Sequence, residues 1–392
     1  MKTAIIIGGG ASGVAAALTL RALQPDADIV ILEKNERILK KLLTTGNGRC
    51  NITNTAVSPA CYPAFAETVI TQYDFERVRA FLLSLSLPIK ADNTGRCYPL
   101  SESANNAVNL LLEALSRANI RIQTSAQVTA IERRNNRYIL QADKSYTADA
   151  VIFAPGSAAA VRGYNGTDLL ADLHINLTPP TPALCPIPST EPFLKSLKGV
   201  RVKGSITLGD KTEHGEIQFN ESNISGICAF NLAKYAYDGC RITLDFCDGL
   251  MDEKTLIEAI ADRARNVQEN AAVLDFLLLR KLALTVLKRA GIKPSGNPKE
   301  LTDAQIHAIA DKIRHFTLTA NKPHDFAHAQ TVCGGLSARD IDPATLESRQ
   351  IKVYLCAAKY WMPMRPAADL ICTGHGLRAC VRHRRQADLY PL

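Results

Sequence analysis

Paired cysteines and long apolar runs are both missing from this chain. Its eleven cysteines form no Cys-x-x-Cys pair and no spacing typical of zinc ligands, which argues against a dithiol–disulfide reductase. In a reducing compartment these cysteines are expected to be free thiols. The longest apolar stretches have only the length of a strand, so no segment is predicted to span a membrane. Because Met1-Lys2-Thr3 leads straight into an apolar run without a signal peptide, we expect a cytoplasmic protein.

Acidic residues are the minority, with 38 Asp and Glu against 46 Lys and Arg and a net charge of +8. Half of this excess lies in residues 356–392, where six basic residues stand against two acidic ones. The remainder is only mildly basic and shows no run of interleaved aromatic and basic residues, so no nucleic-acid partner is expected. The length of 392 residues, 46% of them hydrophobic, is enough for two or three domains with their own cores.

A glycine-rich turn lies between the first two apolar runs of the chain. The turn, Gly8-Gly9-Gly10-Ala11-Ser12-Gly13, is followed by an Ala- and Leu-rich stretch and by a second apolar run that ends at Glu33. This order predicts a strand, a turn, a helix and a strand closed by an acid, which is the arrangement of dinucleotide-binding folds. The alternative is an ordinary turn between strand and helix.

Each glycine of this turn has its own expected role. Gly8 would allow the sharp turn, Gly10 the approach of a pyrophosphate, and Gly13 the close packing of helix and strand. The pyrophosphate would lie on the helix N-terminus, where free N–H groups favour negative charge. Glu33 would accept hydrogen bonds from the adenosine ribose and repel a 2′-phosphate, so the sequence favours FAD or NAD over NADP at this site.

A polar segment with two glycines, residues 44–54, comes shortly after the second apolar run. Its asparagines, Asn47, Asn51 and Asn54, offer amide donors and acceptors that suit the edge of a heteroaromatic ring. Arg49 supplies a fixed positive charge where negative charge could form. We predict a loop that packs over a ligand, and the alternative is a solvated turn.

The rest of the chain alternates between helical and strand patterns. Helices are predicted over residues 65–90 and in a second stretch that ends at Arg117. Strands are predicted between 120 and 154, and the last of them ends at the turn Ala154-Pro155-Gly156-Ser157. Five prolines between 179 and 188 mark a linker, after which short strands near 200–208, 214–219 and 241–246 precede a helical stretch over 251–315. We interpret this part as an inserted β-rich domain carrying helices, whose apolar positions between 273 and 287 serve packing.

The segment from Thr45 to Asn54, with its Gly48-Arg49-Cys50-Asn51 core, closely resembles a bacterial flavoprotein family. This family comprises the BaiN- and YhiN-type FAD-dependent oxidoreductases, some of them labelled aminoacetone oxidase-like. The resemblance extends over about 355 residues. It rests on the segments Ile5 to Glu33, Lys40 to Asn54, Gly95 to Pro99, Ala154 to Ser157, Gly163 to Asp168, Gly215 to Gly226 and Thr331 to Tyr354.

The resemblance implies an α/β fold, in which a Rossmann-like FAD-binding domain of the two-dinucleotide-binding type is interrupted by a β-barrel-like insert with a small helical subdomain. The expected division is 1–185 for the first part of the FAD-binding domain, 186–250 for the β-rich insert, 251–325 for the helical insert, 326–355 for the return to the FAD-binding domain and 356–392 for an aberrant tail.

The resemblance also implies a set of FAD-binding residues. Gly8, Gly10, Ala11, Ser12 and Gly13 would hold the pyrophosphate, and Glu33, Lys34 and Val128 the adenosine half. The flavin side would be lined by Lys41, Asn47, Gly48, Arg49, Cys50, Asn51, Ala154 and Gly156. The last turn is usually Ala-Thr-Gly-Gly in the family, so the hydrogen bond of its threonine is missing here. Cys50 has no resolving partner, which favours a structural role for it over a redox role.

A larger departure from the family begins after Leu355. Members continue with a motif like Gly-Glu-Ile-Leu-Asp-x-Asp and then Gly-Gly-Phe-Asn-Leu, whereas this chain has Cys356-Ala357-Ala358-Lys359-Tyr360-Trp361-Met362-Pro363-Met364-Arg365. A shifted reading frame, however, joins the third base of each codon to the first two bases of the next. In this frame the codons of Tyr360 and Trp361 give Leu, those of Trp361 and Met362 give Asp, and those of Met362 and Pro363 give Ala. The shifted frame can therefore encode Gly-Glu-Ile-Leu-Asp-Ala-Asp-Ala-Pro-Cys-Gly-Gly-Phe-Asn-Leu.

This agreement indicates a frameshift, such as a two-base insertion in a GC repeat near Cys356. The basic tail and the single tryptophan, Trp361, would then be accidents of translation.

The leading functional hypothesis is an FAD-dependent oxidoreductase that acts on a small organic substrate by hydride transfer through the flavin. No second complete Gly-x-Gly-x-x-Gly appears, so NAD(P)H would be a transient electron donor without a domain of its own. The alternatives are a frameshifted remnant that binds flavin weakly or not at all, and an RNA-associated flavoprotein whose basic tail binds phosphate. The pattern identifies no catalytic residue, no metal site and no oligomeric state.

Overall fold

The computed structural model describes residues 2–62, 64–160, 169, 176–342, 344–349 and 354–355. The chain divides into two compact units, one taken from 1–180 and 332–392 and the other formed by Thr181–Thr331. The domain boundaries expected at residues 185, 250 and 325 stay predictions. The expectations for Gly163 to Asp168 and for the tail from Cys356 to Leu392 fall outside the described residues.

The first unit is built on a five-stranded parallel sheet with the strand order β19-β10-β1-β2-β6. Its central strands form because their apolar runs are continuous, as expected for strands that are buried on both faces. In register, Ile7 lies beside Leu32 on one side and Phe153 on the other, and Phe153 lies beside Leu355. The strands are β1 (Thr3–Ile7), β2 (Asp28–Leu32), β6 (Arg121–Gln123), β10 (Ala150–Phe153) and β19 (Tyr354–Leu355).

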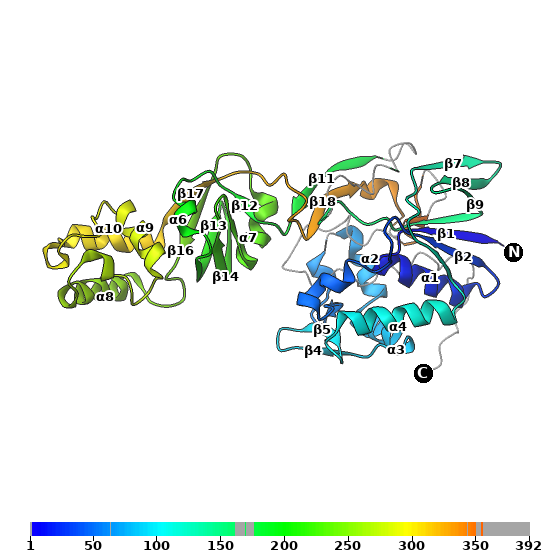
Figure 1. Ribbon diagram of the computed structural model, residues 1–392, viewed down its shortest axis with the longest axis horizontal. Coiled ribbons are helices and arrows are strands. Elements are labelled where there is room, and N and C mark those ends of the chain that lie inside the picture. The colour runs from blue at the N-terminus through cyan, green and yellow to red at the C-terminus, as the bar shows by residue number, and fades with distance from the viewer. Residues whose placement is uncertain are drawn as a thin grey trace. The chain divides into compact units, whose positions relative to one another are not determined.

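Two helices, α1 (Ala11–Leu23) and α4 (Ala104–Arg117), lie side by side and contribute buried residues to one core with the sheet (Figure 1). α1 contributes Ala16 and Ala17, both fully buried, so helix and sheet can approach closely. α4 begins where the Ser103 hydroxyl accepts a hydrogen bond from the Asn106 N–H at 3.3 Å, a side-chain N-cap. A parallel sheet packed with these helices confirms the predicted α/β architecture of the Rossmann type.

Smaller elements complete the first unit. The predicted helical stretch over 65–90 consists of two helices, because the Asp74 carboxylate accepts a hydrogen bond from the Arg77 N–H and starts a new helix. Within the stretch over 120–154 in which strands are predicted, one strand begins at Ala130. These elements are η1 (Leu42–Gly48), η2 (Pro59–Cys61), α2 (Ala64–Gln72), α3 (Phe75–Ser84), η6 (Ala338–Asp340), the sheet of β3 (Thr53–Asn54), β5 (Arg96–Pro99) and β4 (Ile89–Ala91), and the meander of β7 (Ala130–Arg134), β8 (Arg137–Gln141) and β9 (Ser145–Ala148).

A two-stranded sheet pairs β11 (Leu177–Ala183) with β18 (Thr331–Leu336) where the chain passes between the units. The second unit contains a six-stranded antiparallel sheet that curls on itself. Its edge strands approach each other, since the Asn321 N–H donates to the Pro188 carbonyl at 2.9 Å and the Ser189 hydroxyl to the Thr319 carbonyl at 2.6 Å. The order is β12 (Ile187–Pro188), β15 (Asn223–Ser225), β14 (Lys211–Phe219), β13 (Arg201–Leu208), β16 (Cys240–Asp245) and β17 (Phe316–Ala320).

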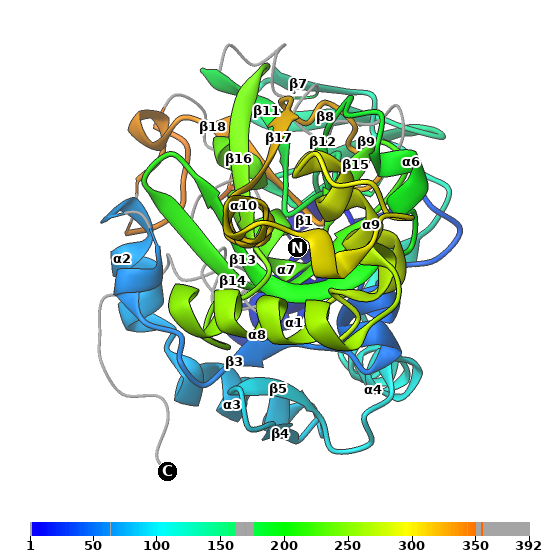
Figure 2. The same cartoon turned by 90° about the vertical axis from the view of Figure 1, so that its left-hand side faces the viewer.

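Three longer helices of the second unit lie together beside the sheet (Figure 2), as the helical pattern over 251–315 predicts. Leu282, Val286 and Leu287 are fully buried and serve packing, as expected for apolar positions between 273 and 287, whereas Leu279 in the same stretch is 59% exposed. The helices are α8 (Glu253–Asn266), α9 (Arg280–Arg289) and α10 (Asp303–Arg314), with the short α6 (Leu194–Leu197), α7 (Ile227–Leu232), η3 (Ala233–Tyr235), η4 (Asn270–Ala272) and η5 (Pro298–Glu300).

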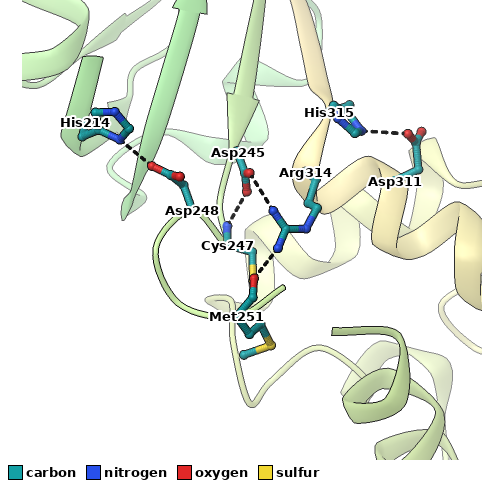
Figure 3. Close-up of polar contacts among 8 residues, drawn as sticks. All are labelled: His214, Asp245, Cys247, Asp248, Met251, Asp311, Arg314 and His315. Carbon is teal, nitrogen blue, oxygen red and sulfur yellow. Dashed lines mark hydrogen bonds and ion pairs between the residues drawn. The ribbon is translucent and has the colours of Figure 1, made fainter. Parts of the chain in front are cut away.

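An ion pair between Asp245 and Arg314 ties α10 to the end of β16 (Figure 3). Their nearest N and O atoms are 3.2 Å apart, and both side chains are about four-fifths buried. The other Asp245 oxygen accepts the Cys247 N–H at 2.7 Å, while the Arg314 guanidinium also donates to the Met251 carbonyl. This group therefore fixes the connection from the sheet to α8 as well as α10.

Replacing Asp245 by alanine should lower the free energy of unfolding by about 2 kcal/mol, because it leaves the largely buried Arg314 without its counter-charge. The matched control is Asp311→Ala, since Asp311 pairs with Lys312 and His315 at the surface and is half exposed. That control should cost less than about 1 kcal/mol. Urea denaturation followed by circular dichroism measures both. Equal losses in the two variants would contradict the anchoring role of Asp245.

Candidate functional site

The glycine-rich turn lies at the carboxyl end of β1, between the ends of β2 and β10. Gly8 has φ +100°, and a Cβ on it would stand 2.1 Å from the Ala154 carbonyl oxygen. The Gly8 N–H donates to the Leu32 carbonyl at 2.7 Å, and the Ala154 N–H to the Ile7 carbonyl at 2.8 Å. The structure thus brings the first turn and the Ala154–Ser157 turn to one edge of the sheet, where open α/β sheets bind their ligands.

Packing against the protein explains the glycine at position 13 but not the glycine at position 10. A Cβ on Gly13 would stand 2.0 Å from the Gly8 carbonyl oxygen, so packing requires glycine there. Gly10 has an extended backbone with φ −76° and ψ −179°, which any residue adopts, and no atom lies within 4 Å of where its Cβ would be. Neither its conformation nor its protein neighbours explain a glycine at position 10.

The N-terminus of α1 has no side-chain cap and no acidic residue in its first turn among the residues described. Ala11, Ser12 and Gly13 form this first turn, which follows Gly10. The first N–H groups of a helix have no partner within the helix, and together with the helix dipole they favour an anion. The open space at Gly10 and this helix start therefore fit a phosphate-containing group.

Glu33 is buried, with 7% of its surface exposed, and both of its carboxylate oxygens accept hydrogen bonds from the protein. One oxygen accepts the Gly9 N–H at 2.8 Å, and the other accepts the Asn35 N–H at 2.8 Å and its side-chain amide at 2.5 Å. Gly9 and Asn35 are parts of the site that the sequence analysis missed. The oxygen that accepts only the Gly9 N–H can accept a second hydrogen bond, so a ribose hydroxyl still fits.

Lys34 and Val128 lie near the same edge of the sheet as Glu33. The Ala126 N–H donates to the Glu33 carbonyl at 2.9 Å, which places the segment leading to the buried Val128 beside the end of β2. Lys34 is half-buried, and this burial lowers the pKa of its ammonium group to about 8. Glu33 opposes this shift and Lys40 adds to it. At neutral pH Lys34 still carries a charge that its surroundings disfavour.

The segment from Leu42 to Asn51 is a chain of tight turns. Gly46, Asn47, Gly48 and Cys50 all have positive φ, between 55° and 82°. At Gly46 a Cβ would stand 2.9 Å from both the Asn51 nitrogen and the Tyr98 ring, so this turn packs against Tyr98. Asn51 and Cys50 are buried, whereas Asn47 and Gly48 are exposed. The buried residues Cys50 and Asn51 thus anchor the loop, and Asn47 and Gly48 face the solvent.

Lys41 connects this loop to the Ala154–Ser157 turn, because its ammonium group donates to the Ser157 carbonyl at 3.2 Å. The Ser157 side chain is 1% exposed, and its hydroxyl has no hydrogen-bond partner among the described residues. A buried hydroxyl without a partner is costly, so a group that binds it would be stabilising. The sequence analysis missed Ser157, although it follows Gly156 directly.

Arg49 is anchored to the protein more firmly than expected. Its guanidinium lies 4.4 Å from the centre of the Tyr98 ring and 3.7 Å from the Glu102 carboxylate. Lys90 also pairs with Glu102, at 2.6 Å, and this hydrogen bond, followed by the charge of Arg49, lowers the pKa of the Glu102 carboxyl. The positive charge of Arg49 is therefore fixed in place and partly balanced by Glu102.

Other expectations can be compared with the described residues directly. Among the described residues, Cys228, Cys240 and Cys247 are free thiols, as predicted. Among the described residues, no three His, Cys, Asp or Glu side chains group as metal ligands. Within the same part of the chain, no helix is long and apolar enough to cross a membrane.

Comparisons with known proteins show similarity over most of the chain. The sequence model of the HI0933-like protein Rossmann domain matches residues 2–358. The 3-dehydro-bile acid delta(4,6)-reductase of Clostridium scindens is 32% identical over 367 residues, covering 88% of this chain and 89% of that protein. The ribosomal RNA dihydrouridine synthase of Haemophilus influenzae is 24% identical over 365 residues, with 88% and 89% covered. That of Escherichia coli is 23% identical over 368 residues, with 89% and 88% covered.

The lowered pKa of Lys34 predicts a pH dependence of stability. Between its folded pKa of about 8 and the ordinary lysine pKa of 10.5 in the unfolded chain, mainly the unfolded chain holds this proton, so the Lys34 contribution to stability rises with pH in that window. Lys34→Met should raise the melting temperature of flavin-free protein at pH 7, and the gain should shrink towards pH 10. The exposed Lys254→Met serves as the control and should show neither effect. A gain for Lys34→Met that is the same at all pH values would contradict the assignment.

Proposed function

Because the chain belongs to the HI0933-like family, whose members are flavin-dependent oxidoreductases, we propose that it is an FAD-dependent reductase of conjugated carbon–carbon double bonds. The names of the relatives support this reaction class. One reduces a bile acid that carries a 3-oxo group and double bonds at positions 4 and 6, and the other forms dihydrouridine, which is uridine with one double bond saturated. In both substrates the double bond is conjugated to a carbonyl group, which allows hydride addition.

The observation that carries the proposal is the space at Gly10. Among the described residues, neither the backbone conformation nor a neighbour calls for glycine there, which supports a role for Gly10 in leaving space for a bound group. The uncapped start of α1 favours phosphate as that group. Glu33, held by the Gly9 N–H, would accept a ribose hydroxyl and repel a 2′-phosphate, which supports FAD as the resident cofactor.

The flavin side of the site would be formed by Lys41, Ser157 and the Asn47–Asn51 segment. The unpartnered Ser157 hydroxyl would contribute a hydrogen bond close to the place of the threonine that the family usually has in this turn. Lys41 and the anchored Arg49 supply positive charge that would stabilise a reduced, anionic flavin. When bound, FAD would supply the hydride chemistry, with NAD(P)H as the transient electron donor. We place this activity in the cytoplasm and expect a small conjugated molecule as substrate.

The tail after Leu355 would weaken this function in the chain as it stands. The family match ends at residue 358, close to the point where the codons indicate a change of reading frame. β19 ends at Leu355 beside β10, so the described sheet is complete before the change. We propose that the tail replaces a segment that would otherwise close over the flavin, and that the described fold forms without it.

Gly10→Val should abolish FAD binding without destabilising the protein. Its two methyl groups would lie where the pyrophosphate is expected, while no protein atom stands within 4 Å of its Cβ. Gly8→Ala is the contrasting variant, because its Cβ would collide with the Ala154 carbonyl and should lower the melting temperature. Flavin released by heat and identified by chromatography, together with melting curves, tests both. Normal FAD content in Gly10→Val would exclude this binding site.

Restoring the alternative frame after Leu355 should raise the flavin content per chain and give an active reductase. Its reduced flavin, prepared with NADPH under exclusion of oxygen, should be reoxidised by a steroid with a 3-oxo group and conjugated double bonds. The matched saturated ketone serves as the control and should not reoxidise it. Equal flavin in both versions of the chain would reject the role given to the tail. Flavin that is bound but not reoxidised by any conjugated carbonyl compound, nor by uridine-containing RNA, would reject the reaction class.

A further inference from the structure

A strongly basic segment in the second unit has no part in the proposed flavin chemistry. From Arg280 to Lys299 the chain carries six Lys and Arg residues and no Asp or Glu. The remaining residues of Thr181–Thr331 carry 13 basic and 18 acidic residues. The sequence analysis expected no basic surface outside the tail, because the surrounding acids cancel this segment in any count over a longer stretch.

The exposed face of α9 carries most of this charge. At about 100° per residue, Arg280, Leu284, Lys288 and Lys281 fall within about 100° of arc. The three basic residues among them are exposed and Leu284 is partly exposed. The opposite side of α9 is buried in the unit through Leu282, Ala283, Thr285, Val286 and Leu287. The helix therefore presents to solvent a single face that is almost entirely cationic.

Lys293 and Lys299 lie in the well-fixed segment that follows α9 in the chain. The Asn270 side-chain amide donates to the Lys293 carbonyl at 2.9 Å, and the Asn270 and Ala271 N–H groups donate to the Gly296 and Pro294 carbonyls. The Lys299 N–H donates to the Asn297 side chain at 3.1 Å. The backbone that carries both lysines is thus held in place before any partner binds, which reduces the ordering that binding requires.

The charges of this surface are largely unbalanced. Arg280 pairs with Asp275 at 2.5 Å, and Arg289 is turned inward over the rings of Phe193 and Phe316. In the part of the chain that the structure describes, Lys281, Lys288, Lys293 and Lys299 form no ion pair. Four lysines without counter-charges are complementary to a polyanion, and Lys281 and Lys288 lie about 10 Å apart along one side of the helix.

Exposed apolar side chains directly precede the basic helix. Phe276 is 42% exposed and Leu279 is 59% exposed, and both lie in the segment that leads into α9. An exposed aromatic ring in the segment that leads into a lysine-bearing helix suits a nucleic acid whose bases are unpaired, since such bases stack on aromatic side chains. A membrane surface fits less well, because the apolar face of α9 is buried in the protein and is not available to lipid.

We propose that this surface, formed by Arg280, Lys281, Lys288, Lys293, Lys299 and Phe276, binds the phosphate backbone of RNA and stacks one of its unpaired bases on Phe276. RNA presents such bases beside phosphates in its loops and bulges. The proposal depends on neither the flavin nor the reading frame of the tail.

The test uses the full chain and a fluorescently labelled RNA stem-loop, with binding measured by anisotropy over a series of salt concentrations. The variant Lys281→Gln/Lys288→Gln/Lys293→Gln/Lys299→Gln should weaken binding at least about tenfold at moderate salt and reduce the slope of log K against log salt by about 3. The matched control removes four exposed lysines elsewhere in the same unit, as Lys195→Gln/Lys198→Gln/Lys254→Gln/Lys322→Gln, and should change both quantities much less. The basic tail is the same in both variants.

Phe276→Ala separates stacking from charge. It should weaken binding of the stem-loop several-fold while leaving the salt slope unchanged, because stacking releases no counterions. Equal losses in the two four-lysine variants would overturn the proposal. So would duplex DNA that binds as tightly as the stem-loop, or binding to vesicles containing phosphatidylserine without binding to RNA.

Discussion

The close approach of three backbone segments at the carboxyl edge of the parallel sheet is the constraint on which the candidate site depends. Gly8 passes the Ala154 carbonyl at a distance that excludes any side chain, and Gly13 passes the Gly8 carbonyl in the same way. The buried Glu33 carboxylate completes this arrangement by accepting the Gly9 N–H from the end of the neighbouring strand. The uncapped end of α1 is therefore held at one defined place, facing the space left by Gly10.

This arrangement separates the residues that shape the site from those that would touch a ligand. Gly8, Gly9 and Gly13 are fixed by protein neighbours, and their replacement would disturb the fold before it disturbed binding. Among the described residues, Gly10 has no close neighbour and the Ser157 hydroxyl has no hydrogen-bond partner. The protein alone therefore gives no reason for the presence of these two groups. Within this turn, Gly8, Gly9 and Gly13 are consequently expected to determine stability, and Gly10 is expected to determine cofactor binding.

Much of this could be predicted from the sequence, because local patterns determine it. The glycine spacing and the position of Glu33 predict strand, turn, helix and acid, and the structure has each of them. The partners of Glu33 could not be predicted, since Asn35 and Gly9 reach it through the three-dimensional course of the chain. Arg49 illustrates the same limit: its charge was clear from the sequence, but its stacking on Tyr98 depends on a strand almost fifty residues away. The basic face of α9 was hidden for a different reason, because helical geometry gathers charges that a count along the chain averages with acidic neighbours.

The position of the proposed frameshift gains its meaning from the sheet. β19 is an edge strand whose described partner is β10, and the register of the pair reaches Leu355, the last residue before the proposed change of frame. The strands that hold the glycine turn, β1, β2 and β10, all precede this point and pair with one another. A change after Leu355 therefore leaves the interactions that form the nucleotide-binding edge intact. What it removes is the sequence that would follow the edge strand, so the expected consequence is a folded protein with an incomplete enclosure for its cofactor rather than an unfolded one.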